Sequence, residues 1–199
     1  MYARENVRYR ALAPHHTPRF APDLPAPGAR ARALALPGYR QARNYSCGYA
    51  CALMVTRYYR PDAGGRELFD RLGTGMDGTR QTALVRELRA SGLSANVRYD
   101  VDFARLQREV DQNKLVISYL HDIDHWIVLY GYGLEPSRVY VADPRPQEIC
   151  QQPWESFSTR LRGFGIVCAD PDARVSAPPM EEPERPVRQP EPVQLAFDF

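Results

Sequence analysis

Long apolar segments are absent from this sequence. No run of about 18 apolar residues, the minimum for a membrane-spanning helix, occurs in the 199 residues. The first residues, MYARENVRYRALAPHH, also lack the continuous apolar stretch of a secretory signal. We therefore expect no membrane segment and no standard export, and we predict a cytoplasmic protein.

Cysteine and lysine are also scarce. The four cysteines are too few for a scaffold built from disulfides, which favours free thiols in a reducing compartment. The basic residues are arginines with one exception, and the N-terminal arginines are scattered among alanine and proline rather than gathered in a stripe. Coding bias explains this pattern more simply than nucleic-acid binding. We predict no direct contact with nucleic acid, no metal and no cofactor.

Composition divides the chain into three parts. The apolar and charged fractions, 44% and 25%, are those of a globular protein, and the length allows one domain with tails. Prolines and arginines gather near the N-terminus, whereas prolines and acidic residues gather near the C-terminus, and such segments are expected to stay extended or mobile. We predict a basic Pro/Arg-rich extension over 1–36, a domain over 37–170 and an acidic Pro-rich tail over 171–199.

The first half of the predicted domain has the apolar spacing of helices. Ser46 is a candidate N-cap, and apolar residues recur on one helical face from Cys47 until Pro61. Further helices are predicted over Arg66–Leu72, over Gln81–Ala90 and from Asp102 onward.

The spacing changes to that of strands in the second half. β-Branched and aromatic residues cluster in four short runs: Leu115–Leu120, His125–Tyr132, Val139–Asp143 and the segment from Phe164. Helices followed by an antiparallel sheet predict the α+β class, with both halves packed around one core.

Cys47 is a candidate nucleophile because of its place in the predicted helix. At the start of a helix, unpaired N–H groups and the positive end of the dipole favour the thiolate, which is the nucleophilic form. His125 opens a strand and is a candidate base for that thiolate. If the runs that begin at His125 and Val139 form a hairpin, Asp143 lies at the same end and orients the imidazole. Gln41, six residues before Cys47, is a candidate side-chain donor to an oxyanion.

These residues and their surroundings resemble a known family. The stretches QARNYSCGYACALMVTRYY, GTGMDGTRQTALVRELRASGL, HWIVLYGY and VYVADP look like the C39 group of papain-like cysteine peptidases, whose best-known members process bacteriocins. The resemblance covers about residues 37–170. It implies a papain-like fold in which the nucleophile helix packs on an antiparallel sheet. It also implies the following roles: Cys47 as nucleophile, His125 as base and acid, Asp143 as orienting residue and Gln41 as oxyanion donor.

The resemblance implies hydrolysis of a peptide or isopeptide-type amide in a peptide or protein substrate. The sequence has no transporter segment, so the double-glycine leaders of the bacteriocin processors are not assumed. Deamidation and acyl transfer remain alternatives, because these reactions differ only in the amide or the nucleophile that enters. A domain with an idle site that only binds its partner is a further alternative.

A zinc site is the alternative from another class. Cys47 and Cys51 are spaced as C-x3-C, and His121 and His125 as H-x3-H, which are the residue types of a Cys2His2 site. The long separation between the two pairs is far from the spacing of a zinc finger. We interpret Cys51 as core packing and His121 as a loop histidine.

The last residues, QLAFDF, form an apolar cluster after a segment rich in proline, glutamate and arginine. Gln194, Leu195, Phe197 and Phe199 look like the short peptide by which bacterial proteins bind the replicative sliding clamp. Phe197 stands where leucine is usual in that peptide. The resemblance implies the bacterial sliding clamp as a partner, and folding of this cluster onto the domain is the alternative.

Overall fold

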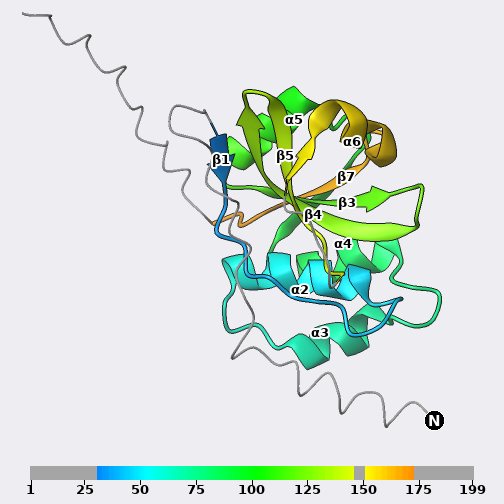
Figure 1. Ribbon diagram of the computed structural model, residues 1–199. Coiled ribbons are helices and arrows are strands. Elements are labelled where there is room, and N and C mark those ends of the chain that lie inside the picture. The colour runs from blue at the N-terminus through cyan, green and yellow to red at the C-terminus, as the bar shows by residue number, and fades with distance from the viewer. Residues whose placement is uncertain (1–30, 146–150, 173–199) are drawn as a thin grey trace, which may run out of the picture.

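The computed structural model describes residues 31–145 and 151–172 (Figure 1). The helices in these stretches are α2 (Cys47–Tyr59), α3 (Gly65–Leu72), α4 (Gln81–Ala90), α5 (Phe103–Asp111) and α6 (Trp154–Leu161). The strands are β1 (Ala31–Ala33), β2 (Ser94–Arg98), β3 (Leu115–Leu120), β4 (His125–Leu134), β5 (Ser137–Ala142), β6 (Gln151–Pro153) and β7 (Gly165–Ala169).

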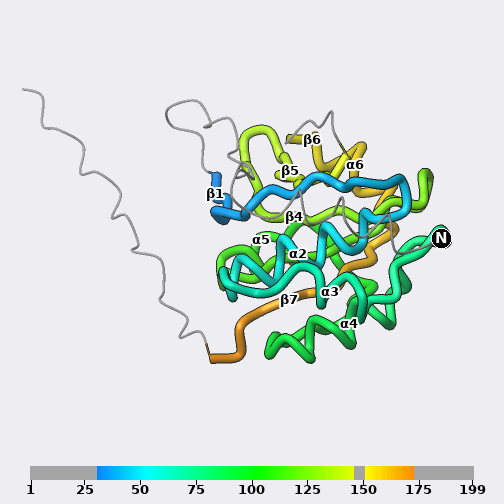
Figure 2. The backbone as a smooth tube through the Cα atoms, turned by 90° about the horizontal axis from the view of Figure 1, so that it is seen from below, coloured from blue at the N-terminus to red at the C-terminus, as the bar shows by residue number. Residues whose placement is uncertain are grey.

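Helices cover both sides of one antiparallel sheet. The strand order is β2-β7-β3-β4-β5-β6, and β1 pairs with β4 beside this path. In Figure 1, α2, α3 and α4 lie below the strands, and α5 and α6 lie above them. The view from below in Figure 2 looks onto α2, α3 and α4. The predicted α+β class, with a helix packed on an antiparallel sheet, is confirmed.

Strand β4 is long enough to pair with three other strands. Its first half pairs with β3, its second half pairs with β1 on that side, and β5 lies along the other side. Gly131 allows β1 to approach, because a Cβ there would lie 2.6 Å from the carbonyl oxygen of Arg32 and 2.5 Å from the ring of Tyr140. A glycine is therefore required where β1 pairs with β4 at this position.

The predicted hairpin between the second and third strand runs is confirmed as β4–β5. Its register pairs Val128 with Ala142. Continued past the end of β5, the register puts Asp143 opposite Ile127 and Arg145 opposite His125. Residues that are opposite or two apart share a face of the sheet, so the side chains of 125, 143 and 145 project on the same side.

Several helix and strand ends agree with the sequence prediction. Helix α4 and strand β3 have the predicted bounds, and α5 begins after Asp102, whose carboxylate accepts from the N–H of Arg105 at 2.6 Å. Strands β1, β2 and β6 were not predicted. β2 lies at an edge and alternates only weakly, so its sequence SANVR has little strand signal.

The folded region begins before residue 37. Ala31–Ala33 pairs with β4, and Leu34 and Leu36 are buried in the core. The sequence of residues 31–36 has no clear helical or strand periodicity, so it does not predict a structure there. Pairing with β4 and burial of the two leucines hold this segment in place. The QLAFDF cluster with Gln194, Leu195, Phe197 and Phe199, the rest of the predicted extension and most of the predicted tail lie outside the described residues.

Within residues 31–145 and 151–172, every helix falls short of the length and apolar character that a bilayer crossing requires.

Candidate active site

Cys47 begins helix α2 and lies where that helix meets the sheet. The residue is 4% exposed, and His125 and the backbone N–H groups of Trp126 and Gly48 lie close enough to its sulfur to stabilise the charged form. Burial alone raises the pKa of the thiol, but these groups and the charge of His125 together bring the pKa below its ordinary value. The surroundings of Cys47 therefore favour a thiolate.

Ser46 precedes α2 but does not cap it with its side chain, contrary to the sequence prediction. Its hydroxyl donates to the carbonyl of Arg43 at 3.0 Å and accepts from the N–H of Arg43 at 3.1 Å. These bonds close the loop before the helix, and the Ser46 side chain makes no capping hydrogen bond to the first turn of α2. The N–H groups of that turn therefore remain available to a negative charge in front of the helix.

His125 is the first residue of β4, and Asp143 directly follows β5. A hydrogen bond of 2.6 Å joins Nε2 of His125 to Oδ1 of Asp143, and both side chains are buried. Burial alone lowers the pKa of His125, but its hydrogen bonds to Asp143 and Cys47 raise the pKa to about 9. Because Nε2 is bound to Asp143, Nδ1 is the nitrogen left for the sulfur. The three groups can hold a thiolate–imidazolium pair at neutral pH.

Asp143 has a second partner that the sequence analysis did not identify. Nη2 of Arg145 lies 2.6 Å from Oδ2 of Asp143, and the backbone N–H of Arg145 donates to Oδ1 at 2.9 Å. Burial raises the pKa of Asp143, but hydrogen bonds to His125 and Arg145 outweigh burial and lower the pKa below its ordinary value. The hairpin register was the signal in the sequence that would have found Arg145.

Gln41 lies in the loop before α2 and is tied to the segment that carries Asp143. Its backbone N–H donates to the carbonyl of Pro144 at 2.6 Å, and its Nε2 donates to the carbonyl of Arg43 at 2.9 Å. Its Oε1 is buried without a hydrogen-bond partner among the described residues. The structure therefore fixes the backbone of Gln41 beside Pro144, the residue after Asp143, and among the described residues no hydrogen bond joins Gln41 to Cys47.

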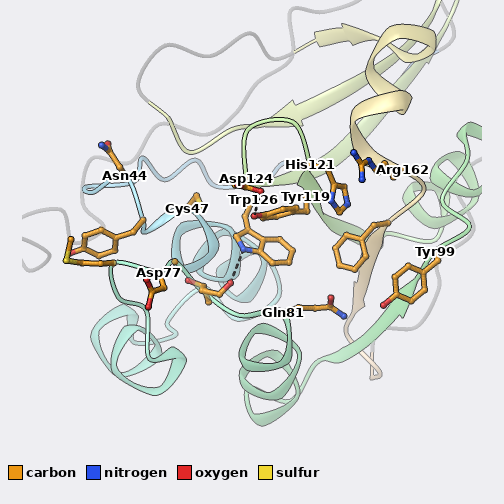
Figure 3. A pocket seen from close by; sticks show the side chains of 15 residues that line it. Asn44, Cys47, Asp77, Gln81, Tyr99, Tyr119, His121, Asp124, Trp126 and Arg162 are labelled. Carbon is orange, nitrogen blue, oxygen red and sulfur yellow. Dashed lines mark hydrogen bonds between the residues drawn. The ribbon is translucent and has the colours of Figure 1, made fainter.

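A cleft of about 1050 Å³ opens in front of Cys47. In Figure 3, Asp77 lies near the Cys47 end, and His121, Arg162 and Tyr99 lie at the other end. Between them stand Trp126 and other aromatic rings of the cleft wall. The cleft thus has an aromatic middle, which Asp124 also lines, and charged side chains at both ends, Asp77 and Arg162.

The turn between α3 and α4 holds the wall of the cleft against α2. The indole Nε1 of Trp126 donates to the carbonyl of Thr79 at 3.0 Å, which Figure 3 shows as a dashed line. A Cβ on Gly48 would lie 2.6 Å from Cβ of Thr79 and 3.0 Å from the Trp126 ring. The glycine after Cys47 is therefore required by close packing, which a sequence pattern alone does not reveal.

The remaining residues of the zinc alternative lie elsewhere. Cys51 is fully buried, and burial raises its pKa well above the ordinary value. His121 packs edge-on against Tyr119, with ring centroids 5.2 Å apart, in the wall of the cleft. No three His, Cys, Asp or Glu side chains within 31–145 and 151–172 are grouped to hold a metal ion. The Cys2His2 interpretation has no support in this region.

A buried thiol at a helix N-terminus, paired with a histidine from an antiparallel sheet, is the arrangement of papain-like cysteine peptidases. The chain belongs to the Peptidase C39 family, whose model matches residues 36–173. It is thus a papain-like cysteine peptidase, as predicted. A search of curated proteins gave no match.

Solved structures of C39-type domains share the fold. A double-glycine-motif protease from an AMS/PCAT transporter, in complex with its leader peptide, is 21% identical, with a TM-score of 0.56 over 68% of this chain and 92% of that one. The peptidase domain of Streptococcus ComA is 20% identical, with a TM-score of 0.54 over 66% and 96%. A C39-like peptidase from Bacillus anthracis is 15% identical, with a TM-score of 0.57 over 70% and 98%.

Proposed function

We propose that this protein hydrolyses peptide bonds with Cys47 as the nucleophile, His125 as the general acid and base, and Asp143 as the residue that orients the imidazole. The observation that carries this proposal is the chain of contacts from sulfur to imidazole to carboxylate, with its 2.6 Å bond between His125 and Asp143. The lowered pKa of Cys47 and the raised pKa of His125 both favour the reactive ion pair.

In the first step the Cys47 thiolate attacks the carbonyl carbon of the substrate amide and forms a C–S bond. The His125 imidazolium then gives its proton to the amide nitrogen, the C–N bond breaks, and the amine leaves. Neutral His125 next takes a proton from water, and the hydroxide attacks the thioester. The C–S bond breaks, the carboxylic acid leaves, and the thiolate–imidazolium pair is restored.

Two kinds of N–H donor are proposed for the oxyanion that forms during attack. One is the backbone of the first turn of α2, to which the Ser46 side chain makes no capping hydrogen bond. The other is Gln41, because its Nε2 carries two hydrogens and the bond to Arg43 uses one of them. The bond from the Gln41 N–H to Pro144 anchors the loop that would deliver this donor.

The proposed substrate is a peptide segment of a protein, bound along the cleft. The aromatic middle of the cleft offers apolar contact area next to Cys47. A leader peptide is the bound molecule in the AMS/PCAT protease structure, which supports a peptide here without assigning the double-glycine motif.

The test is a comparison of new peptide termini. A complex mixture of tryptic peptides is incubated with the wild-type protein or with Cys47→Ala, and new N-termini are labelled and sequenced by mass spectrometry. Wild-type protein is expected to produce termini that Cys47→Ala does not. A gain of about one mass unit at Asn or Gln without new termini would favour deamidation, and conjugation to an added amine would favour acyl transfer. If Cys47 reacts with a thiol-directed reagent but none of these products forms, an idle binding module is favoured.

We also propose that Gln194, Leu195, Phe197 and Phe199 bind the bacterial sliding clamp and thereby recruit the peptidase. The support is the sequence pattern of a glutamine followed by aliphatic and aromatic anchors after a Pro-rich tether. Purified clamp is expected to bind the full chain and not a chain truncated after Pro192. Equal binding by both chains would contradict the assignment.

A further inference from the structure

The carboxylate of Asp143 is held from two sides. His125 takes one side through the 2.6 Å bond to Oδ1. The guanidinium of Arg145 takes the other side, with Nη2 at 2.6 Å and Nε at 3.0 Å from Oδ2, and Nε also at 3.2 Å from Oδ1. A planar guanidinium that meets a carboxylate with two nitrogens fixes its orientation as well as its charge.

Arg145 and Asp143 differ strongly in burial. The side chain of Arg145 is 40% exposed, whereas that of Asp143 is 4% exposed. Arg145 is thus the accessible member of the pair, and replacing it removes no core side chain. The Pro144 between them is bound through its carbonyl to the N–H of Gln41, so the backbone of this turn has an anchor that does not depend on the Arg145 side chain.

We propose that Arg145 is a positioning residue. Its guanidinium holds the Asp143 carboxylate in the orientation that His125 requires, and it partly neutralises the negative charge of that carboxylate. This inference rests on the proposed roles of Cys47, His125 and Asp143. Without the guanidinium, the carboxylate is free to rotate about its Cβ–Cγ bond and its full charge acts on the imidazole. The imidazole then binds its proton more tightly and is oriented less well.

Among the described residues, the following titratable and charged groups lie near this pair. Cys47 and Cys51 approach from α2, and Cys51 feels the charge of Asp143. From the loop after β3, Asp122 feels Arg145 and forms its own ion pair with Arg160 of α6 at 2.8 Å. Removal of Arg145 therefore leaves Asp143 with His125 as its charged hydrogen-bond partner within the described residues.

The test measures His125 by NMR, because this needs no substrate. The full chain is labelled at its histidine rings, and the His125 signal is assigned by its loss in His125→Gln. Two quantities are recorded: the pKa of His125 and the downfield resonance of the N–H that His125 directs at Asp143. They are compared in the wild type, in Arg145→Gln and in Arg145→Lys. Arg160→Gln is the matched control, because it removes a guanidinium from a neighbouring carboxylate that is not part of the site.

In Arg145→Gln the pKa of His125 is expected to rise by about half a unit to one unit, and the downfield resonance to broaden or disappear. Hydrolysis of a peptide identified with the wild type is expected to fall by about ten- to a hundredfold, mainly in kcat. Arg145→Lys keeps the charge but loses the fork, so the pKa is expected to stay near the wild-type value while the resonance weakens. Arg160→Gln is expected to leave both quantities unchanged.

An unchanged pKa and an unchanged resonance in Arg145→Gln would overturn the role of Arg145, whatever happens to the activity. If Arg145→Gln does not fold, Arg145→Lys decides: a weakened resonance at an unchanged melting temperature supports the role, and a wild-type resonance overturns it. A wild-type protein that hydrolyses no peptide but responds to Arg145→Gln as expected would contradict the proposed function alone.

Discussion

Cys47 and Cys51 lie one turn apart on the same helix, yet their surroundings drive the two thiols in opposite directions. Both are buried, at 4% and 0% exposure. Burial raises the pKa of Cys51 well above its ordinary value, whereas hydrogen bonds from His125, Trp126 and Gly48 overcome burial at Cys47 and lower the pKa. Burial alone therefore favours the neutral thiol, and at the N-terminal start of α2 the groups around Cys47, among them His125 and Trp126 of β4, favour the thiolate.

The largest expected difference between the two cysteines is in hydrolysis. Cys47→Ala removes the proposed nucleophile, and peptide hydrolysis is expected to fall by about four orders of magnitude or more. Cys51→Ala leaves the reacting groups in place, and its activity is expected to stay within about twofold at a cost of about 1 kcal/mol in unfolding free energy. Initial rates and urea unfolding of both variants measure this contrast. Equal loss of activity in folded variants would contradict it.

Removal of the partner of Cys47 is expected to make Cys47 resemble Cys51. In His125→Ala, burial is no longer opposed by the imidazole, so the pKa of the Cys47 thiol rises. Alkylation of Cys47 by iodoacetamide at neutral pH is expected to slow by about ten- to a hundredfold.

The other buried thiols serve as internal controls for that measurement. Burial raises the pKa of Cys168 to about 12 and that of Cys51 well above its ordinary value. Both are expected to react slowly in the wild type and in His125→Ala, as followed by peptide mass spectrometry. Fast alkylation of Cys51 in the folded wild type would refute the comparison.

An added methyl group is expected to be tolerated less well in the first turn of α2 than in the turn between α3 and α4. In Gly48→Ala the new Cβ meets Thr79 at 2.6 Å and forces α2 away from the cleft wall. We expect a loss of about 1 to 3 kcal/mol in unfolding free energy and about tenfold in activity. Gly75→Ala is the matched control, because nothing lies within 4 Å of a Cβ there. Similar thermal stabilities of the two variants would argue against close packing at Gly48.

The smallest expected effect is the pH dependence near the upper limit of activity. The reactive pair exists above the lowered pKa of Cys47 and below the pKa of His125, which is about 9. Activity is therefore expected to rise with pH as Cys47 loses its proton, to hold through neutral pH, and to fall by about half near pH 9 as His125 loses its proton. The pH profile of kcat/KM measures both limbs. A fall that begins near pH 6.5 would mean that Asp143 does not support the imidazolium.

Local patterns of apolar residues in the sequence predict much of the fold. Helix α4 and strand β3 were predicted with their bounds because each has strong periodicity and a clear break at its ends. Strands β1 and β6 have three residues each, and such short segments have too few positions to show alternation. They exist because a neighbouring strand offers hydrogen bonds, which is information from outside the segment.

Part of the candidate site was also predictable from the sequence. A cysteine at a helix start and a histidine at a strand start are local signals, and the hairpin adds Asp143. Arg145 was missed, because its role depends on the register of β4 and β5 and not on a motif. The contact of Gly48 with Thr79 depends on the approach of a turn 31 positions further along the chain.

By itself, the sequence determined the helices from α2 to α5 and the strands β3, β4, β5 and β7, and that Cys47 starts a helix, because these depend on side chains close together along the chain. Only the tertiary structure decided that the sulfur meets His125, that Arg145 shares the carboxylate of Asp143, and that Cys51 stays in the core. The reason is that a pKa depends on the charges, hydrogen bonds and water within a few ångströms, and those neighbours come from distant parts of the chain.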